Sequence, residues 1–404
     1  SRIDESELTR SQRKRLKQWE REQARLRYEA GQDGGYGGGG RGGSRGGNGG
    51  YDGRGHQPRK KRHVLRNLII VLAVLAGLFL VVYIGFRKWF SSGYQGEADV
   101  MTNDIDQEHD VWDDYISILI LGTDGNEEDG GSYNGGDVDI LVSINRTTGD
   151  IRMLSFYRDL YLVNEEGETN KLTNIFRRGD ATSSINALNI NYDLRINEYM
   201  TVGWDSVAEA IDLLGGVEVD VPDEMLEMMN VYIEHTATVT GMENVPVTHA
   251  GTQVLNGVQA VAYCRIRYVT VQGYSYGDFG RSERQREVLS ALFQKAKSSS
   301  PLDMMNIVRT MWPKVETSLT MEECLSLVPL IATMNLADTA GFPRSDETAD
   351  HRRAGYAGTA SVVYSSDTLS DISWIYEYLF GITGYVPSSR AQQYAAMVAA
   401  EISD

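Results

Sequence analysis

Cysteine, histidine and proline are scarce in this chain of 404 residues, which holds two, six and eight of them. Two cysteines cannot form the dense disulfide framework of a small secreted fold. The sequence leaves open whether Cys264 and Cys324 pair with each other. The chain contains no C-x-x-C, H-E-x-x-H or G-x-x-x-x-G-K-[ST] motif. Neither a zinc site nor a P-loop nucleotide site is therefore expected.

Basic and acidic residues are segregated along the chain. Residues 1–66 carry 17 basic and 8 acidic side chains, a net charge of +9. Residues 89–404 have a net charge of −28, and Arg87 and Lys88 bring the total to −17. An apolar run without any charge, residues 68–86, separates the basic part from the acidic part.

Residues 68–86 are nineteen consecutive uncharged residues. A helix of this length spans roughly the 30 Å hydrocarbon core of a bilayer. We predict a single transmembrane helix at 67–86. The alternative, a buried core helix, fits less well because the run is apolar on every face. Basic residues flank its N-terminal side, so we expect residues 1–66 in the cytoplasm and residues 91–404 outside the cell. The predicted location is the cell membrane.

The segments on either side of this run differ in composition. Residues 1–66 are basic, and 31–55 contain fifteen glycines, which predicts a flexible tail. Arg-Gly stretches also suit nucleic acid or anionic lipid, but a solvated tether is the preferred interpretation and nucleic acid is not an expected partner. Residues 91–113 are predicted to be an acidic linker, 114–384 one external domain and 385–404 a C-terminal tail, which either docks as a helix or trails free.

The predicted external domain alternates short strands and helices. Strands are expected where Ile- and Val-rich runs end in glycine or acidic turns, and helices where apolar residues recur at helical spacing. The expected strands are 116–121, 139–144, 151–156, 217–221 and 362–364. The expected helices are 183–192, 206–214, 255–263, 282–297, 303–311, 321–334 and 369–380. This alternation predicts an α/β fold in which helices cover a sheet.

Three aspartates lie at the ends of predicted strands. Asp124 follows the first strand, and Asp137 and Asp139 lie at the entry to the next. Ligands of open α/β folds gather beyond the carboxyl ends of the strands. Asp124 and Asp137 are therefore candidates to share one Mg²⁺ through oxygen ligands. The alternative is that Asp124 caps a turn and Asp137 is a solvated loop residue.

Arginines are concentrated in one stretch of 22 residues. They are Arg265, Arg267, Arg281, Arg284 and Arg286. The first two are two residues apart, so on an extended segment both point to one side. The next helix has Ser282 as its predicted N-cap, and Arg281, Arg284 and Gln285 are spaced to share a face at its start. Guanidinium groups and helix N-termini both bind phosphate, which predicts a pyrophosphate site. The alternative is a set of surface salt bridges.

Six blocks of sequence occur in an order that is specific to one family. They are ILILGTD at 118–124, DVDILVSIN at 137–145, MLSFYRDLYL at 153–162, INEYMTVGWDSVAEAIDLLGGVEVDVP at 196–222, LNGVQAVAYCRIRY at 255–268 and GDFGRSERQREVLSALFQKA at 277–296. Together they resemble the LytR-CpsA-Psr family of bacterial cell-wall enzymes. The resemblance covers roughly residues 115–300.

This resemblance implies an α-β-α sandwich with a central mixed β-sheet and a hydrophobic pocket for a lipid tail. It also implies an Mg²⁺-dependent phosphotransferase that moves a glycopolymer from a polyprenyl-pyrophosphate carrier to peptidoglycan. The expected catalytic residues are Asp124, Asp137, Arg158 and Arg265, of which the two aspartates would hold Mg²⁺. The residues expected to bind the pyrophosphate are Arg158, Arg265, Arg267, Arg281, Arg284 and Gln285, with Arg284 the weakest candidate.

The chain departs from the family pattern at three places. Gly135 and Asn126 stand where arginines are common, and the segment 171–176 lacks a usual histidine. Arg177 or Arg178 would have to supply the missing positive charge. These departures leave open a catalytically weak polyprenyl-phosphate-binding scaffold or envelope regulatory protein. The basic tail leaves open a signalling protein that contacts nucleic acid.

Overall fold

The computed structural model describes residues 80–81, 83–105, 111–123, 136–271, 277–327 and 333–403. The chain divides into two compact units, residues 1–71 and 72–404, and every described residue belongs to the second. The predicted tail and most of the predicted membrane span lie outside the described residues, as does Asp124. Among the residues described, no helix is both long and apolar enough to cross a membrane.

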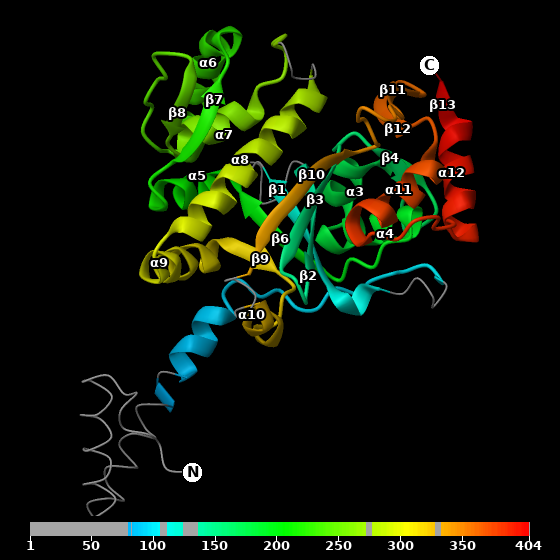
Figure 1. Cartoon of the computed structure of the whole chain (residues 1–404), viewed down its shortest axis with the longest axis horizontal. Coiled ribbons are helices and arrows are strands. Elements are labelled where there is room, and N and C mark those ends of the chain that lie inside the picture. Colours follow the sequence, from blue (N-terminus) through cyan, green and yellow to red (C-terminus); the bar gives the residue numbers. More distant parts are fainter. Residues whose placement is uncertain are drawn as a thin grey trace, which may run out of the picture. The chain divides into compact units, whose positions relative to one another are not determined.

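A six-stranded sheet forms the centre of the second unit (Figure 1), with the strand order β10-β3-β2-β1-β6-β9. Its strands are β1 (Tyr115–Thr123), β2 (Gly136–Asn145), β3 (Asp150–Phe156), β6 (Glu198–Gly203), β9 (Val315–Thr317) and β10 (Asn335–Phe342). β2 runs antiparallel to β1 and β3, and β9 to β6, whereas β6 is parallel to β1 and β10 to β3. The predicted α/β fold with a central mixed sheet is therefore confirmed.

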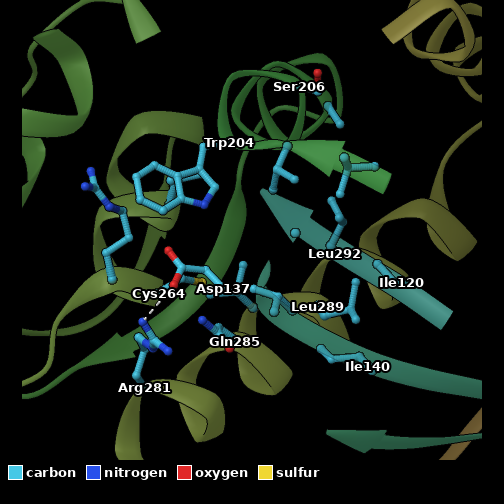
Figure 2. Close-up of a pocket in the computed structure, with 18 of the residues that line it drawn as sticks. Ile120, Asp137, Ile140, Trp204, Ser206, Cys264, Arg281, Gln285, Leu289 and Leu292 are labelled. Carbon is cyan, nitrogen blue, oxygen red and sulfur yellow. Dashed lines mark hydrogen bonds and ion pairs between the residues drawn. The ribbon is translucent and has the colours of Figure 1, made fainter. Parts of the chain in front are cut away.

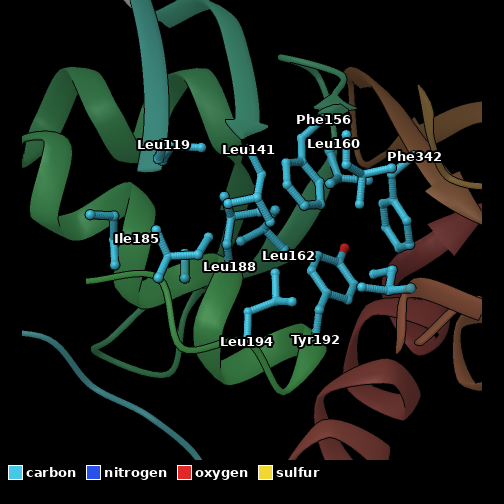
Figure 3. Close-up of a cluster of buried hydrophobic side chains, with 14 of the residues drawn as sticks. Leu119, Leu141, Phe156, Leu160, Leu162, Ile185, Leu188, Tyr192, Leu194 and Phe342 are labelled. Carbon is cyan, nitrogen blue, oxygen red and sulfur yellow. The ribbon is translucent and has the colours of Figure 1, made fainter. Parts of the chain in front are cut away.

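Leucines from neighbouring strands form one face of this sheet. Leu119 pairs with Leu141, which pairs with Leu154, so the three lie in a row across β1, β2 and β3. They belong to a buried cluster that includes side chains of three helices (Figure 3). These helices are α3 (Leu172–Arg178), α4 (Ala181–Tyr192) and α11 (Thr368–Phe380).

The opposite face of the sheet carries mainly β-branched residues. Ile118 pairs with Val142, which pairs with Met153, one step along the strands from the leucine row. Because side chains alternate along a strand, this row faces the other way. Leu289 and Phe293 of α8 (Asp278–Ser298) pack against it. Helices therefore cover both faces, as the pattern of alternating strands and helices predicts.

A second apolar cluster surrounds a hairpin at the side of the sheet. Its elements are α5 (Trp204–Leu213), β7 (Val217–Val221), α6 (Leu226–Thr240), β8 (Gly251–Leu255) and α7 (Gly257–Arg265). Asn256 and Gln259 form a capping box at the start of α7. A Cβ on Gly257 would lie 1.9 Å from the carbonyl oxygen of Ala208, so glycine is required for α7 to contact α5.

The remaining elements lie at the edges of the domain. They are β4 (Tyr161–Val163), β5 (Thr169–Lys171), α9 (Pro301–Met311), α10 (Met321–Leu327), β11 (Arg352–Ala357), β12 (Ala360–Ser365), α12 (Ser389–Glu401) and β13 (Ile402–Ser403), with short 3₁₀ helices at Trp112–Asp114, Asp223–Met225 and Trp312–Lys314. β12, β11 and β13 form a small separate sheet.

Some predicted helix boundaries were wrong. α8 begins at Asp278, one turn before the predicted N-cap Ser282, because Gly277 adopts a positive φ of 69° and turns the chain into the helix. The helix predicted at 255–263 begins at Gly257, since Leu255 is still paired in β8. The helix predicted at 321–334 is described only to Leu327.

The predicted acidic linker, residues 91–113, is not a free spacer where the structure describes it. Tyr94 bridges to Thr317 of β9, and Asn103, Ile105 and Trp112 are buried against the domain. Their apolar contacts and the Asn103 side chain account for this packing, which the acidic composition of the segment concealed. The folded domain therefore starts before residue 114.

The C-terminal segment also docks on the domain. β13 pairs with β11, and α12 is held at its N-cap by the buried carboxylate of Asp193, which follows α4. Asp193 Oδ2 accepts a hydrogen bond from the backbone N–H of Ser388 (2.7 Å), and Oδ1 accepts from Ser388 Oγ (2.6 Å) and from Asn103 Nδ2 (2.6 Å). One carboxylate thus joins the linker, α4 and α12.

We predict that Asp193→Ala lowers the free energy of unfolding by about 3 kcal/mol or more, because three hydrogen bonds to a buried carboxylate are lost. Alanine is also strained at this position, where φ is 55°. Urea unfolding would give the loss, and amide hydrogen exchange would show early opening of 389–401. Glu166→Ala, an exposed control, is expected to change stability by less than about 0.5 kcal/mol. Equal stability of the two variants would contradict the prediction.

Candidate active site

A cavity of about 560 Å³ lies between the central sheet and the α5–α7 cluster. Most of its wall is aliphatic. The apolar side chains come from β1, β2, β6, α5, α7, α8 and α9, and include Ile120, Ile140, Met200, Val207, Val261, Leu289, Leu292, Ile307 and Met311. Polar groups, Asp137, Arg281 and Gln285 among them, gather at one side (Figure 2). The pocket therefore has a mainly apolar wall and a charged end.

Asp137 is the centre of the charged end. It lies at the start of β2, and its Oδ1 accepts from Arg158 Nη1 at 2.6 Å and from Arg281 Nη1 at 3.4 Å. Arg267 Nη2 lies 3.8 Å from the same oxygen. The three arginines come from the loop after β3, the first turn of α8 and the loop after α7. Segments far apart in the sequence thus meet at one carboxylate.

Asp278, the first residue of α8, is a second carboxylate in this group. Its oxygens lie 3.1 Å from Arg267 Nε, 3.6 Å from Arg281 Nη2 and 3.9 Å from Arg158 Nε. Three guanidinium groups therefore face two carboxylates, Asp137 and Asp278. Asp278 was not among the site residues predicted from the sequence, although its position three residues before Arg281 at a helix start is the signal that identifies it.

Burial and the neighbouring carboxylates shift the pKa values of two of these arginines. Burial lowers the pKa of Arg281, and the carboxylates of Asp278 and Asp137 oppose that decrease. Arg158 is less buried, and although burial lowers its pKa, Asp137 and Asp159 raise it above the ordinary value overall. A guanidinium group keeps its proton at neutral pH in either case, so both side chains are permanent positive charges.

Asp139 lies two residues further along β2, is 1% exposed, and has no hydrogen-bond partner for either carboxylate oxygen. Its pKa is raised to about 7, first by burial and then by the neighbouring Asp137 charge, against which Arg281 and Arg158 act. The sequence placed Asp139 at the strand entry but did not assign it a role. It is a buried acid beside this site whose oxygens have no hydrogen-bond partner.

Asp137, which lines the pocket, and Asp139, which is buried outside the lining two residues further along β2, are oxygen donors of the kind that a hard divalent cation prefers. Asp137 and Asp139 supply oxygen donors, and the unpartnered oxygens of Asp139 are groups whose burial a cation would offset. Asp124, the other predicted magnesium ligand, lies outside the described residues, so its position relative to Asp137 stays a prediction. The donor set present therefore fits Mg²⁺ better than a soft metal.

Arg265 lies at the pocket wall but apart from the other arginines. It is the last residue of α7, not part of an extended segment with Arg267 as predicted, because the helix continues through it. Its guanidinium stacks 3.7 Å over the ring of Trp204 and donates to Thr236 Oγ1 at 2.7 Å. Gln285 lines the pocket one turn after Arg281, as predicted from the helix spacing.

Arg284 is a structural residue, and its assignment to the pyrophosphate site was wrong. It is 1% exposed, and its guanidinium donates to the backbone carbonyls of Tyr263 (3.2 Å) and Ile266. It therefore holds the end of α7 against α8 and is directed away from the pocket. Spacing on the helix suggested a shared face, but α8 starts one turn earlier than predicted and presents Arg281 and Gln285 to the cavity.

The residues proposed to compensate for the family departures do not reach the pocket. Arg177 and Arg178 are exposed at the end of α3, and Arg177 donates to Asn174. Gly135 and Asn126 lie outside the described residues. Cys264 and Cys324 are free thiols, which answers the question that the sequence left open.

Comparison with known sequences identifies the family. The pattern of the LytR_cpsA_psr family matches residues 88–350, well over half of the chain. The chain belongs to the LytR-CpsA-Psr family. The resemblance of the six sequence blocks is thereby confirmed.

Curated relatives include two named as polyisoprenyl-teichoic acid–peptidoglycan teichoic acid transferases of Bacillus subtilis. TagT is 26% identical over 298 residues, which cover 70% of this chain and 87% of TagT. TagV is 25% identical over 301 residues, which cover 70% of this chain and 72% of TagV. Biofilm regulatory protein A of Streptococcus mutans is 31% identical, but over 193 residues that cover 45% and 44% of the two chains.

Solved structures share the fold of this family member. A transcriptional regulator of Enterococcus faecalis superposes with a TM-score of 0.54 at 20% identity, covering 72% of this chain and 98% of its own. B. subtilis TagT superposes with a TM-score of 0.50 at 20% identity, with the same coverage of both chains. At this level of identity the likeness supports the fold, including its central mixed sheet.

The family match ends at residue 350. Arg352, just beyond it, contacts two aromatic residues that are next to site residues in the sequence. Arg352 of β11 donates to Tyr157 Oη at 2.9 Å and stacks 4.1 Å over the ring of Phe279. The rings of Tyr157 and Phe279 themselves meet edge to face at 4.9 Å. These two aromatic residues are adjacent in sequence to Arg158 and Asp278. The C-terminal segment of the chain therefore helps to fix the charged end of the pocket.

We predict that Arg284→Ala lowers the free energy of unfolding by roughly 3 kcal/mol or more, because it removes a buried charge-assisted donor and leaves two carbonyls unsatisfied. Thermal or urea unfolding measures this loss. The exposed Arg309→Ala is the matched control and is expected to leave stability within about 0.5 kcal/mol of the parent. A fully stable Arg284→Ala chain would show that the guanidinium is not a structural donor.

A second prediction concerns Asp139 in metal-free buffer with EDTA. Since its folded pKa is raised to about 7, the fold favours the protonated form, and stability is lost as pH rises from about 4 to about 7. Between pH 5 and pH 8 this amounts to roughly 2–3 kcal/mol. Asp139→Asn should remove that part of the pH dependence in urea unfolding, whereas the exposed Asp113→Asn should keep it. An unchanged slope in Asp139→Asn would refute the assignment.

Proposed function

We propose that this chain is a membrane-anchored, Mg²⁺-dependent phosphotransferase. Its substrate is a glycopolymer linked through pyrophosphate to a polyprenyl lipid, and its acceptor is a hydroxyl group of peptidoglycan. The observation that carries the proposal is a cluster of three arginines and two carboxylates at one end of an apolar cavity of about 560 Å³. The names of TagT and TagV, which describe teichoic acid transfer from a polyisoprenyl carrier to peptidoglycan, support it.

The arginines suit the pyrophosphate of such a substrate. Arg158, Arg267 and Arg281 reach a common point from three segments, and planar guanidinium groups bind phosphate oxygens in pairs. In the structure these three arginines are paired with Asp137 and Asp278. Binding of the diphosphate would exchange these internal ion pairs for contacts to phosphate. Gln285 adds an uncharged donor beside Arg281.

Magnesium would be held by Asp137 with Asp139 nearby and, as predicted from the sequence, by Asp124. When bound, the ion would neutralise charge on the phosphate oxygens and release Asp137 from its arginines. Asp139 lies in position to lose its proton in that state, because the added positive charge compensates its burial. The arginines remain to stabilise the negative charge that develops during transfer.

The proposed reaction breaks the phosphoanhydride bond of the pyrophosphate and forms a phosphoester bond to the acceptor. The acceptor hydroxyl attacks the phosphorus that bears the sugar, the bond to the bridging oxygen breaks, and polyprenyl phosphate leaves. The glycopolymer is then joined to peptidoglycan by a phosphodiester, and the hydroxyl proton is released. Arg158, Arg267 and Arg281 bind the two phosphoryl groups and orient them. The aliphatic wall of the pocket holds the prenyl chain and excludes water from it.

Anchoring and location follow from the sequence and are part of the same proposal. The charge-free run 68–86 would place residues 1–66 in the cytoplasm and the catalytic domain at the outer surface of the cell membrane. A lipid-linked substrate and a peptidoglycan acceptor are both found there. The alternative of a binding scaffold predicts the same ligand without turnover.

We predict that Asp137→Asn and Arg281→Ala each abolish transfer from a polyprenyl-pyrophosphate glycan. Arg281→Ala should also weaken binding of the lipid pyrophosphate about tenfold or more, since one charge-assisted contact is lost. Arg281→Lys should lose affinity as well, because a point charge cannot reproduce the planar fork. Turnover with Mg²⁺ and calorimetric titration measure the two effects.

The control for these variants is Arg390→Ala, an exposed position on α12 that is remote from the pocket and should change neither quantity. Melting temperatures of all the variants exclude unfolding as the cause. Tight binding by the parent chain without any release of polyprenyl phosphate would favour the scaffold. Full activity of Asp137→Asn would contradict the metal assignment.

A further inference from the structure

Helix α9 carries an exposed apolar stripe on the surface of the domain. Leu302, Met305 and Val308 are 75%, 63% and 45% exposed. They are three residues apart, so their side chains lie on one side of the helix. A row of large apolar side chains held in water marks a surface that contacts something else. We call Leu302, Met305 and Val308 the α9 stripe.

The opposite side of α9 lines the cavity. Ile307 and Met311 are part of the pocket wall. At about 100° of rotation per residue, they point roughly 140° away from the centre of the α9 stripe. A helix that is apolar on two sides is one that is covered on both. The inner side of α9 is covered by the pocket, so the α9 stripe requires an outer partner.

The end of the apolar run 68–86 lies beside the same helix. Residues 83–90 are helical, and Trp89 Nε1 donates to the backbone carbonyl of Arg309 in α9 at 3.2 Å. Trp312, directly after α9, donates through Nε1 to the carbonyl of Phe90 at 2.7 Å, and their rings stack at 4.9 Å. Tryptophans at the end of an apolar run are typical of the headgroup layer. The α9 stripe therefore lies next to the point where the anchor would leave the bilayer.

Positive charge is gathered around this part of a domain that is otherwise strongly acidic. Arg87 and Lys88 flank the anchor, Arg309 lies on α9, and α8 ends in Lys295 and Lys297 immediately before α9. A hollow of about 480 Å³ beside the anchor includes Arg87 and Lys88 in its lining. An anionic lipid surface would attract this end of the domain and repel the rest. That charge pattern favours a membrane over a second copy of the chain.

We propose that the α9 stripe is a membrane-contact surface that sits in the interface of an anionic bilayer. The proposal rests on the proposed membrane anchor and extends it to the folded domain. α9 then forms a partition with lipid on its outer side and the pocket on its inner side. A prenyl chain moving from bilayer to pocket passes along this helix without crossing bulk water.

The first test measures contact with lipid and needs no enzyme activity. Full-length chains with Met305→Trp or Val254→Trp are placed in vesicles of phosphatidylglycerol and phosphatidylcholine that contain lipid spin-labelled near the headgroup. Val254 is a matched control, 58% exposed on β8. The fluorescence added by Met305→Trp should be quenched at least about twofold more than that added by Val254→Trp. Equal quenching in a chain that floats with the vesicles overturns the proposal.

Flotation separates the failure of this inference from the failure of the anchor. A full-length chain that does not float with vesicles contradicts both the anchor and the membrane-contact surface. A chain that floats, shows no quenching at Met305→Trp and forms a dimer shows that a second copy covers the stripe, which overturns the inference alone. Neither result depends on transferase activity.

The second test separates substrate delivery from chemistry. Leu302→Gln with Met305→Gln should lower turnover of a long-chain lipid pyrophosphate in vesicles about tenfold, and leave turnover of a water-soluble short-chain analogue unchanged. Val231→Gln with Val254→Gln, both exposed and remote from α9, should alter neither rate. Equal losses on both substrates would overturn a role in delivery. Absence of turnover in the parent chain counts against the proposed function, while the quenching test still decides the membrane contact.

Discussion

The carboxylate of Asp137 is the point at which the charged end of this molecule is assembled. Arg158, Arg267 and Arg281 come from three different segments, and like-charged guanidinium groups repel each other unless an anion lies between them. Asp137 supplies that anion from the start of strand β2, and Asp278 supplies a second one from the start of α8. The three guanidinium groups are therefore held together by two acids of the chain itself.

The same constraint explains why the charged groups lie at the end of the cavity and not along it. An unpaired charge in an aliphatic wall would lose its hydration without compensation. Clustering Arg158, Arg267 and Arg281 with Asp137 and Asp278 at one end pairs these charges with each other, and most of the remaining wall is apolar. Asp139 is the exception, since its oxygens have no partner and its pKa is raised to about 7. A buried carboxyl group of this kind is tolerated where a proton or a cation neutralises its charge.

Segments outside the central sheet stabilise this arrangement. Arg352, which lies just beyond the family match, clamps Tyr157 and Phe279 and so fixes the neighbours of Arg158 and Asp278. Asp193 joins the linker residue Asn103 to the N-cap of α12, which keeps the C-terminal helix on the domain. On the other side, Trp89 and Phe90 attach the end of the apolar run to α9 and Trp312. The domain is thus stabilised by contacts from residues 89–90 and by contacts from the C-terminal segment.

The sequence by itself determined the parts of this protein that depend on local order. Short Ile- and Val-rich runs at 116–121 and 139–144 predicted strands, and six sequence blocks indicated the family, because a short strand or a binding motif is encoded by near neighbours. The concentration of arginines also indicated the helix start at which Arg281 lies beside Asp137.

Only the tertiary structure decided which of those arginines face the cavity. Arg284 and Arg281 are equally plausible by spacing, yet one turn of helix buries the first against backbone carbonyls and points the second at Asp137. Asp278 is a site residue because α8 starts there, and Arg265 stacks on Trp204, which precedes it by sixty-one residues. Contacts between distant segments depend on how helices and strands pack, and spacing along the chain carries no direct record of that packing.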